Sequence, residues 1–180
     1  MAACTSLRTD SARDLVVFFN PIAKASGATV ILASSSDEKL ARARQLGADH
    51  LINYRAVPAW DEEVLKLTGG RGADLVVETV GAATIARSLH AAAVGGTVFT
   101  IGFVGGTASA VDLLPIILKS LRVVGNSTGS VADLAEAARA IAAHRIVPVI
   151  DRTFARGETA AAYAELGAGG RHFGKIAIVG

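Results

Sequence analysis

Residues 27–55, GATVILASSSDEKLARARQLGADHLINYR, predict a strand, a polar turn, a helix and a second strand in immediate succession. Residues 29–33 form a short apolar run rich in β-branched side chains, and residues 50–53 resume an extended apolar pattern. Between these runs, residues 37–46 carry an apolar stripe at helical spacing, and Gly47 ends the helix. Two strands joined by a crossover helix make a βαβ unit, so the stretch predicts a parallel sheet.

Three serines, Ser34, Ser35 and Ser36, stand at the predicted junction between the first strand and the helix. Ligands of open parallel sheets bind at the carboxyl ends of the strands, and a helix N-terminus attracts anions. The serine cluster therefore indicates an anion site, and Lys39 is a candidate to hold a phosphate there. The alternative is structural, because Ser35 and Glu38 have the spacing of a capping box and Lys39 would then be a surface lysine.

The composition is typical of a single α/β domain. The chain has 180 residues, of which 51% are hydrophobic and only 5% aromatic, so Ala, Val, Ile and Leu must build the core, as in parallel sheets with helices on both faces. A net charge of +2, with the charges interspersed, argues against nucleic-acid binding, which needs a clustered basic face. Cys4 is the single cysteine, which excludes an internal disulfide and fits a reducing, cytoplasmic setting. No apolar stretch approaches the ~20 residues that span a bilayer, so no membrane association is expected.

Helical and extended patterns continue to alternate along the chain. Further strands are predicted at residues 74–79, 97–101, 122–124, 149–154 and 175–179, and further helices at residues 58–68, 82–93, 111–120, 131–144 and 158–166. Ser130 is the expected N-cap of the helix that follows it. The pattern divides the chain into an atypical segment at residues 1–14, a doubly wound α/β domain at residues 15–147, and a strand–helix–strand extension of the same unit at residues 148–180.

Several segments together resemble one protein superfamily. They are SSSDEKL, GADH and INYR within residues 34–55, DLVVETVG at residues 74–81, GGTVFTIGFVGG at residues 95–106 and GRHFGKIAIVG at residues 170–180. In this order and spacing they resemble the cofactor-binding half of the medium-chain, zinc-type alcohol dehydrogenase and quinone oxidoreductase superfamily. The resemblance implies a Rossmann-type domain that binds a nicotinamide dinucleotide, with hydride transfer between NADPH and a carbonyl or quinone in the intact protein. It also implies that the catalytic and zinc-carrying lobes lie outside this chain, so the isolated chain is expected not to be catalytically competent.

The N-terminal segment departs from the pattern of that superfamily. The first central strand and the glycine-rich turn of the superfamily fall on residues 1–14, MAACTSLRTDSARD, which contain no glycine. We therefore expect the first central strand, matched to residues 3–8, to be weak or absent, and Asp14 to lie where a diphosphate should bind. Pro21 is expected to interrupt the helix that follows. These features are typical of a truncated, alternatively started or frameshifted copy.

The resemblance also implies which residues hold the adenosine end of the cofactor. Lys39 and Tyr54 match positions that surround the adenosine 2′-phosphate in quinone-reductase-like relatives, and Arg171 matches a basic residue that approaches the same phosphate. Recognition of NAD requires an acidic side chain at the end of the second strand, where this chain has its serine cluster, and the nearest carboxylate, Asp37, starts the helix. The sequence therefore predicts NADP(H) as the preferred cofactor.

The nicotinamide end is expected at the ends of two other strands. By the resemblance, the residues that face the ribose and the nicotinamide amide are Val80, Gly81, Ile101, Gly102 and Phe103. A glycine permits close approach of the backbone to a ligand, but at each position a simple strand-to-loop turn is an equal alternative. Glu78 lies at the same edge and is expected to be a solvated or hydrogen-bonded structural carboxylate rather than a catalytic one.

A remote alternative is a serine hydrolase. The segment GNSTG between a strand and a helix matches the G-x-S-x-G pattern, with Ser127 as nucleophile, His144 or His172 as base, and Asp133 or Asp151 as the third member. Against it, the helix is expected to begin three residues after the serine, whereas a hydrolase serine sits at the sharp turn itself. The four histidines show no metal-ligand spacing, so no metal site is expected in this chain.

A third hypothesis is a non-catalytic regulatory or dimerising module. The strand at Arg122–Gly125 is expected to lie at an edge of the sheet, where it can pair with a second copy of the chain.

Overall fold

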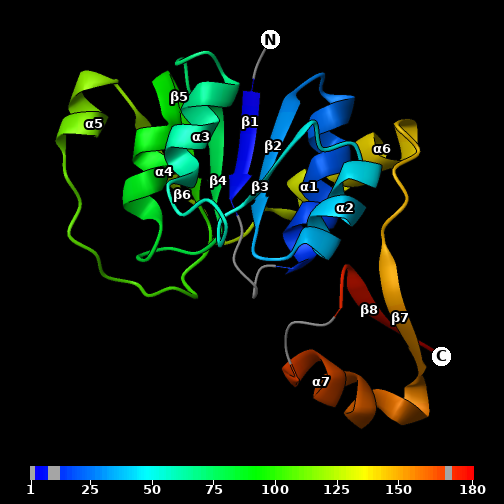
Figure 1. The fold of residues 1–180 in the computed structure, drawn as a ribbon. Coiled ribbons are helices and arrows are strands. Elements are labelled where there is room, and N and C mark those ends of the chain that lie inside the picture. The colour runs from blue at the N-terminus through cyan, green and yellow to red at the C-terminus, as the bar shows by residue number, and fades with distance from the viewer. Residues whose placement is uncertain (1–2, 8–12, 169–171) are drawn as a thin grey trace.

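The computed structural model describes residues 3–7, 13–168 and 172–180, which form a larger α/β domain and a smaller C-terminal unit (Figure 1). The strands are β1 (Ala3–Leu7), β2 (Thr29–Ser34), β3 (His50–Asn53), β4 (Ala73–Glu78), β5 (Ala92–Thr100), β6 (Arg122–Gly125), β7 (Ile150–Ala155) and β8 (Lys175–Val179). The helices are α1 (Arg13–Ala25), α2 (Asp37–Gln45), α3 (Trp60–Leu67), α4 (Ile85–Ala91), α5 (Leu114–Leu118), α6 (Val131–Ala143), the 3-10 helix η1 (Arg156–Glu158) and α7 (Thr159–Gly167).

The larger sheet is doubly wound. Within the described residues its six strands are ordered β3-β2-β1-β4-β5-β6, and every neighbouring pair is parallel. The chain starts in the middle of this sheet, builds outward to β3, and then crosses over to build β4, β5 and β6 on the other side. This topology places the carboxyl ends of all six strands at one edge. The predicted α/β fold with a parallel sheet is therefore confirmed.

The first central strand, which was expected to be weak or absent, is present at Ala3–Leu7, within the residues 3–8 that were matched to it. β1 pairs with β2 on one side and with β4 on the other. Both neighbours are well-buried strands whose backbone N–H and C=O groups need partners, and any extended segment can supply them. Of residues 11–14, which were matched to the glycine-rich turn, residues 11 and 12 lie outside the described residues, and Arg13 and Asp14 begin α1.

The helix α1 also differs from expectation, because it runs through Pro21 instead of stopping there. A proline inside a helix removes one backbone hydrogen bond and normally kinks or ends the helix. Here the part of α1 around Pro21 is packed into the domain, since Asn20 and Ala23 are both buried. Tertiary packing therefore outweighs the local preference of the proline.

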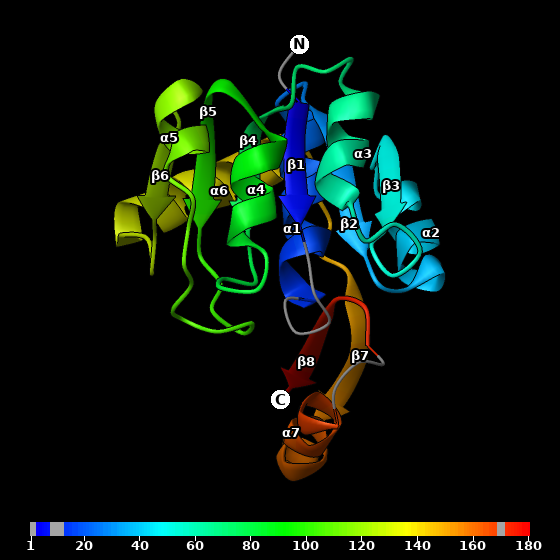
Figure 2. The same cartoon turned by 60° about the vertical axis from the view of Figure 1, so that its left-hand side comes forward.

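Helices lie on both faces of the sheet (Figure 2), and an apolar cluster fills the space on each face. Along β2, Val30 and Leu32 belong to the cluster that α1 and α2 cover, whereas Ile31 and Ala33 belong to the cluster that α3 and α4 cover. This alternation is the expected period of two along a strand, and both sets are buried because both faces are covered. The sheet core is made of Ala, Val, Ile and Leu, as the composition predicts.

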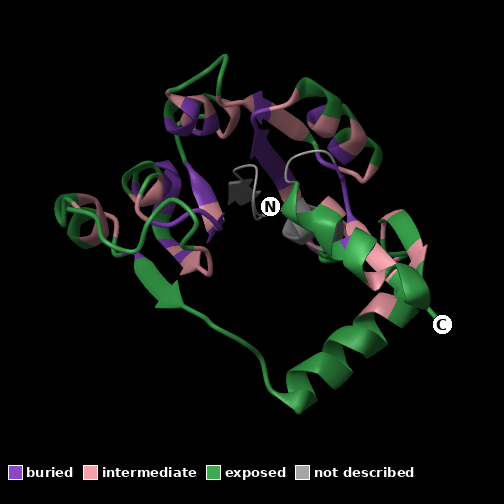
Figure 3. Cartoon of the chain, turned by 90° about the horizontal axis from the view of Figure 1, so that it is seen from below, coloured by how far each residue is buried: buried purple, intermediate pink, exposed green. Residues whose placement is uncertain are grey.

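The C-terminal part of the chain is much more exposed than the sheet domain (Figure 3). The helix α6 has no buried residue, and Ser130 caps it through a capping box with Asp133, as predicted. The strands β7 and β8 pair in parallel as a separate two-stranded sheet, and α7 packs against them. None of the helices in the described ranges is both long and apolar enough to cross a membrane.

Candidate functional site

Polar residues gather at the start of α2, where β2 ends. Ser34 and Ser35 are buried, and Ser36 is half-buried. Ser36 is the N-cap of α2, because its hydroxyl accepts a hydrogen bond from the backbone N–H of Lys39 over 3.4 Å. The predicted capping box of Ser35 and Glu38 is therefore wrong by one residue. With the cap at Ser36, the first turn of α2 still presents its N-terminal amides at the sheet edge, the arrangement that attracts anions.

The end of β3 lies directly beside this helix start. The backbone N–H of Tyr54 donates to the carbonyl of Ser34 over 3.1 Å, which holds the two strand ends together. The ring of Tyr54 packs partly against the apolar cluster on the α3 face, which contains Ile52 and Trp60. The structure thus brings the serines, Lys39 and the backbone of Tyr54 to one corner of the sheet edge, while the ring of Tyr54 lies on the α3 face.

Arg171, predicted to approach the same corner, lies outside the described residues.

The carboxylate nearest to the serines in the sequence already has a hydrogen-bond partner. Asp37, the first residue of α2, accepts a hydrogen bond of 2.7 Å from the side-chain amide of Asn53. This contact directs the carboxylate toward the end of β3. No acidic residue occupies the end of β2 itself, where Ser34 and Ser35 stand.

The loops that follow β4 and β5 are joined backbone to backbone. The backbone N–H of Gly105 donates to the carbonyl of Val80 over 2.7 Å, and that of Ala82 donates to the carbonyl of Gly106 over 3.0 Å. The backbone N–H groups of Ile101 and Gly102 both donate to the backbone carbonyl of Glu78. The five residues predicted for the nicotinamide end are therefore brought together in one structural unit. The sequence analysis missed Gly105 and Gly106 as members of this unit, although the GFVGG pattern contained them.

Two of these glycines are required by the close packing of the loops. Gly81 has a φ of +91°, and a Cβ on it would lie 2.6 Å from the carbonyl oxygen of Gly106. A Cβ on Gly102 would lie 1.7 Å from the carbonyl oxygen of Thr79, far closer than two non-bonded atoms can approach. The packing of the loops thus requires glycine at both positions, whether or not a ligand binds there.

The side chain of Glu78 is hydrogen-bonded to the loop that follows β4. Its carboxylate is completely buried and accepts hydrogen bonds from the backbone N–H groups of Val80 and Gly81 at 2.7 and 3.0 Å. The hydroxyls of Thr84 and Ser88 donate to it as well, at 2.9 and 2.5 Å. All these donors belong to the β4–α4 turn and to α4, so the prediction of a hydrogen-bonded structural carboxylate is confirmed.

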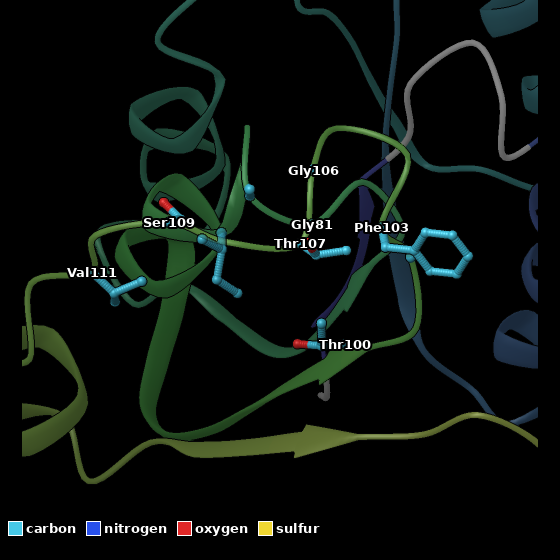
Figure 4. Close-up of a pocket in the computed structure, with 10 residues that line it drawn as sticks. Gly81, Thr100, Phe103, Gly106, Thr107, Ser109 and Val111 are labelled. Atoms are coloured by element: carbon cyan, nitrogen blue, oxygen red, sulfur yellow. The ribbon is translucent and has the colours of Figure 1, made fainter.

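A pocket of about 360 Å³ opens beside these loops (Figure 4). Gly81, Gly102 and Phe103 border it, and the other lining residues are Ala82, Ile85, Thr100, Gly106, Thr107, Ser109 and Val111. The hydroxyl of Thr100 is buried and is not hydrogen-bonded to any described residue. None of the lining side chains is charged, so the pocket suits a neutral group and has no acid or base of its own.

The residues of the hydrolase hypothesis are not brought together. Asp133 is held in the capping box at the start of α6, whereas His144 follows the end of that helix, about 16 Å further along its axis at 1.5 Å per residue. Asp151 accepts hydrogen bonds from Arg42 and from the backbone of Phe173. The geometry around Ser127 therefore lacks an assembled triad among the described residues.

Among the described residues, no group of three or more His, Cys, Asp or Glu side chains is arranged to hold a metal ion. The candidate site is therefore the carboxyl edge of the sheet, with a polar corner at α2 and an uncharged pocket at the β4 and β5 loops.

Comparison with known proteins agrees with this geometry. A zinc-type alcohol dehydrogenase-like protein of Schizosaccharomyces pombe is 37% identical over 160 residues, which cover 87% of this chain and 46% of the relative. A crystal structure of a Sinorhizobium meliloti 1021 protein assigned as an alcohol dehydrogenase has a TM-score of 0.87 at 40% identity, covering 98% of this chain and 51% of that one. The chain thus spans about half the length of the relatives that it matches.

Other solved structures bind or use nicotinamide cofactors. An NAD-dependent alcohol dehydrogenase superposes with a TM-score of 0.83 at 30% identity, over 99% of this chain and 52% of its own. A mycobacterial protein in complex with NADPH does so with a TM-score of 0.79 at 26% identity, over 100% of this chain and 59% of its own. The zinc-binding dehydrogenase family model matches residues 18–143. With this match, the Rossmann-type sheet and these relatives, the chain belongs to the zinc-binding dehydrogenase family and corresponds to its cofactor-binding domain.

Proposed function

We propose that the chain binds NADP(H) across the carboxyl edge of the sheet. The adenosine 2′-phosphate lies at the N-terminus of α2, and the ribose and nicotinamide lie along the β4 and β5 loops. The observation that carries this assignment is the end of β2, where two buried serines, and no acidic residue, meet the N-terminus of α2, whose Asp37 is hydrogen-bonded to Asn53. Hydroxyls and helix amides are donors, and donors suit a phosphate.

The choice between the two cofactors rests on the same corner. Family membership alone leaves it open, since one solved relative is NAD-dependent and another is in complex with NADPH. An NAD site uses an acidic side chain at the end of the second strand to accept a hydrogen bond from the ribose 2′-hydroxyl. Here Asp37 is hydrogen-bonded to Asn53 instead. This arrangement favours a 2′-phosphate, with Lys39 in the first turns of α2 as its cationic partner.

The nicotinamide end would supply the hydride chemistry of the family when the cofactor is bound. In an intact dehydrogenase of this kind, we propose hydride transfer between NADPH and a carbonyl or quinone. The pocket at the β4 and β5 loops is uncharged, so this chain positions the ring but offers no acid or base beside it. We assign no step to a metal. We therefore expect cofactor binding by the chain alone without measurable NADPH oxidation in the presence of a quinone.

Substitution of Lys39 tests the cofactor assignment. A charge-assisted hydrogen bond contributes roughly 1.5–3 kcal/mol, so Lys39→Ala should weaken NADPH binding about ten- to a hundredfold. NADH lacks the 2′-phosphate, and its affinity should change by less than about twofold. The matched control is Arg44→Ala, which removes a cation from an exposed position of the same helix. Calorimetric titration of both cofactors against the three proteins gives the four ratios needed.

Three results of these titrations would contradict the assignment. Tighter binding of NADH than of NADPH by the unaltered chain would reject the preference. An equal effect of Lys39→Ala on both cofactors would remove Lys39 from the phosphate site. An equal loss in Arg44→Ala would trace the effect to the net charge of α2.

A dimer formed through β6 is a second proposal, compatible with the first. Among the described strands β6 pairs only with β5, and its Val123 and Val124 are exposed. Asn126 donates toward β5, so by alternation the backbone N–H of Val123 points outward. Val123→Pro should then abolish a dimer detected by light scattering, while Val131→Pro, at the first helical position of α6, should leave it intact. A monomeric unaltered chain at all concentrations would refute the dimer. The cytoplasmic setting stays a prediction from the cysteine content.

A further inference from the structure

The C-terminal unit meets the sheet domain at a joint that consists of Arg42, Asp151 and Phe173. Figure 1 shows β7, β8 and α7 extending away from the sheet domain beneath α1 and α2. Phe173, just before β8, is only 2% exposed and packs into the apolar cluster with Leu40 and Ala43 of α2. This ring is therefore the apolar anchor of the unit on α2.

Arg42 closes the joint from the helix side. Its guanidinium lies 4.4 Å from the centre of the Phe173 ring, and its Nη1 lies 3.4 Å from Oδ1 of Asp151. The same Asp151 oxygen accepts the backbone N–H of Phe173 over 3.0 Å, and the Arg42 guanidinium also reaches the Phe173 carbonyl. One arginine thus stacks on the ring and hydrogen-bonds both a carboxylate and a carbonyl. This use needs the planar fork of a guanidinium, which a lysine lacks.

The joint lies on the same stripe of α2 as Lys39. Three half-buried residues lie along α2 and its C-cap: Lys39, Arg42 and Leu46. They are spaced three and four residues apart, so they form one line along the helix. Arg42 is one turn beyond Lys39, about 4.5 Å further along the helix axis. The C-terminal unit therefore docks on α2 about one turn from the proposed 2′-phosphate corner.

We infer that Arg42 is a positioning residue that couples docking of the C-terminal unit to binding of a 2′-phosphorylated nucleotide. The inference rests on the proposed function. Docking fixes α2 in place, and a fixed helix presents Lys39 and its N-terminus to a phosphate at a lower ordering cost. The charge of Arg42 itself is compensated by Asp151, so its part is to hold the unit rather than to contact the phosphate. Because coupling is reciprocal, the nucleotide must also stabilise the docked unit.

The test compares two nucleotides that differ only in the 2′-phosphate, adenosine 2′,5′-bisphosphate and adenosine 5′-monophosphate. Calorimetry gives their affinities for the unaltered chain, for Arg42→Met and for the control Arg44→Met, which alters an exposed residue of the same helix. We expect Arg42→Met to weaken the bisphosphate about five- to tenfold and to leave the monophosphate unchanged, with no effect in Arg44→Met. In the unaltered chain the bisphosphate should also slow hydrogen exchange in β7 and β8, and the monophosphate should not.

The outcomes separate the joint from the nucleotide site. If Arg42→Met speeds exchange in β7 and β8 but keeps the selectivity for the bisphosphate, the joint is merely structural and the inference is wrong. If the unaltered chain itself shows no preference for the bisphosphate, the proposed function fails first and the coupling fails with it. Should Arg42→Met not fold, Asp151→Asn offers a milder break of the same joint. It must then show the same loss of selectivity, and unchanged selectivity would overturn the inference.

Discussion

Asn20 shows how a single buried residue can weaken an otherwise apolar domain. Its side chain is fully buried in the middle of α1, and neither its amide nitrogen nor its amide oxygen is hydrogen-bonded to any described residue. Burial of an amide without a partner costs the desolvation of that group. The neighbouring buried position of α1 that faces the sheet, Ala23, is apolar. Asn20 is therefore a local conflict between sequence and fold.

Replacement of Asn20 by leucine should stabilise the chain. Leucine has the same number and branching of side-chain heavy atoms and a better helix propensity, and it leaves no unpaired polar group, so we expect a gain of about 1–3 kcal/mol in the free energy of unfolding. The control is Asn126→Leu, at an exposed position after β6, which should change the stability by less than about 0.5 kcal/mol. Urea denaturation followed by circular dichroism measures both. A loss of stability in Asn20→Leu would mean that the amide has a partner after all.

At the scale of elements, α3 and α4 are joined by a carboxylate at their interface. Asp61, whose side chain is 8% exposed, lies 2.5 Å from a guanidinium nitrogen of Arg87 and 2.7 Å from Nδ1 of His90. Burial alone would raise the pKa of Asp61, but the hydrogen bonds from Arg87 and His90 outweigh it and lower this pKa below its ordinary value of 3.8. Asp61 therefore contributes stability in its charged form.

This shift predicts an acid-dependent loss of stability. A carboxyl group with a lowered pKa in the folded state stabilises the protein above its ordinary pKa, and the contribution disappears as the pH falls through the folded-state value. At neutral pH, Asp61→Asn should cost roughly 1–3 kcal/mol. The difference from the unaltered chain should shrink between about pH 5 and about pH 3. The control Asp74→Asn, at an exposed pair with Arg71, should cost less than about 1 kcal/mol. A constant difference over this pH range would contradict the assignment.

Local sequence patterns were sufficient to predict the elements whose ends do not depend on a specific contact with a distant segment. The helix predicted at residues 37–46 is Asp37–Gln45, and the strands predicted at residues 50–53 and 175–179 have those bounds. The helix predicted from residue 82 begins only at Ile85, because Ala82 is bonded to Gly106 of the next loop. Such a contact joins segments far apart in the chain, so no local spacing reveals it. β1 is the same case, since its partners on both sides make it a strand.

At the scale of the whole molecule, the sheet topology places residues that are far apart in the sequence along one edge of the sheet. The sequence predicted that strand ends would carry the site, and the structure brings the serines, Lys39 and the backbone of Tyr54 to one corner and the β4 and β5 loops to another. The sequence could not reveal that Gly81 and Gly102 are needed for contact between the loops. Nor could it reveal that Asn53 holds Asp37, or that Arg42 meets Phe173. Each of these contacts depends on side-chain directions that only the packed fold defines.

The most direct test of a dinucleotide site at this edge is backbone hydrogen exchange of the chain with and without saturating NADPH. The account predicts slower exchange at the start of α2, at Tyr54 and in the loops that follow β4 and β5, with no change in α6. Protection confined to α6 and the neighbouring Ser127 segment, or no protection at any NADPH concentration, would contradict it.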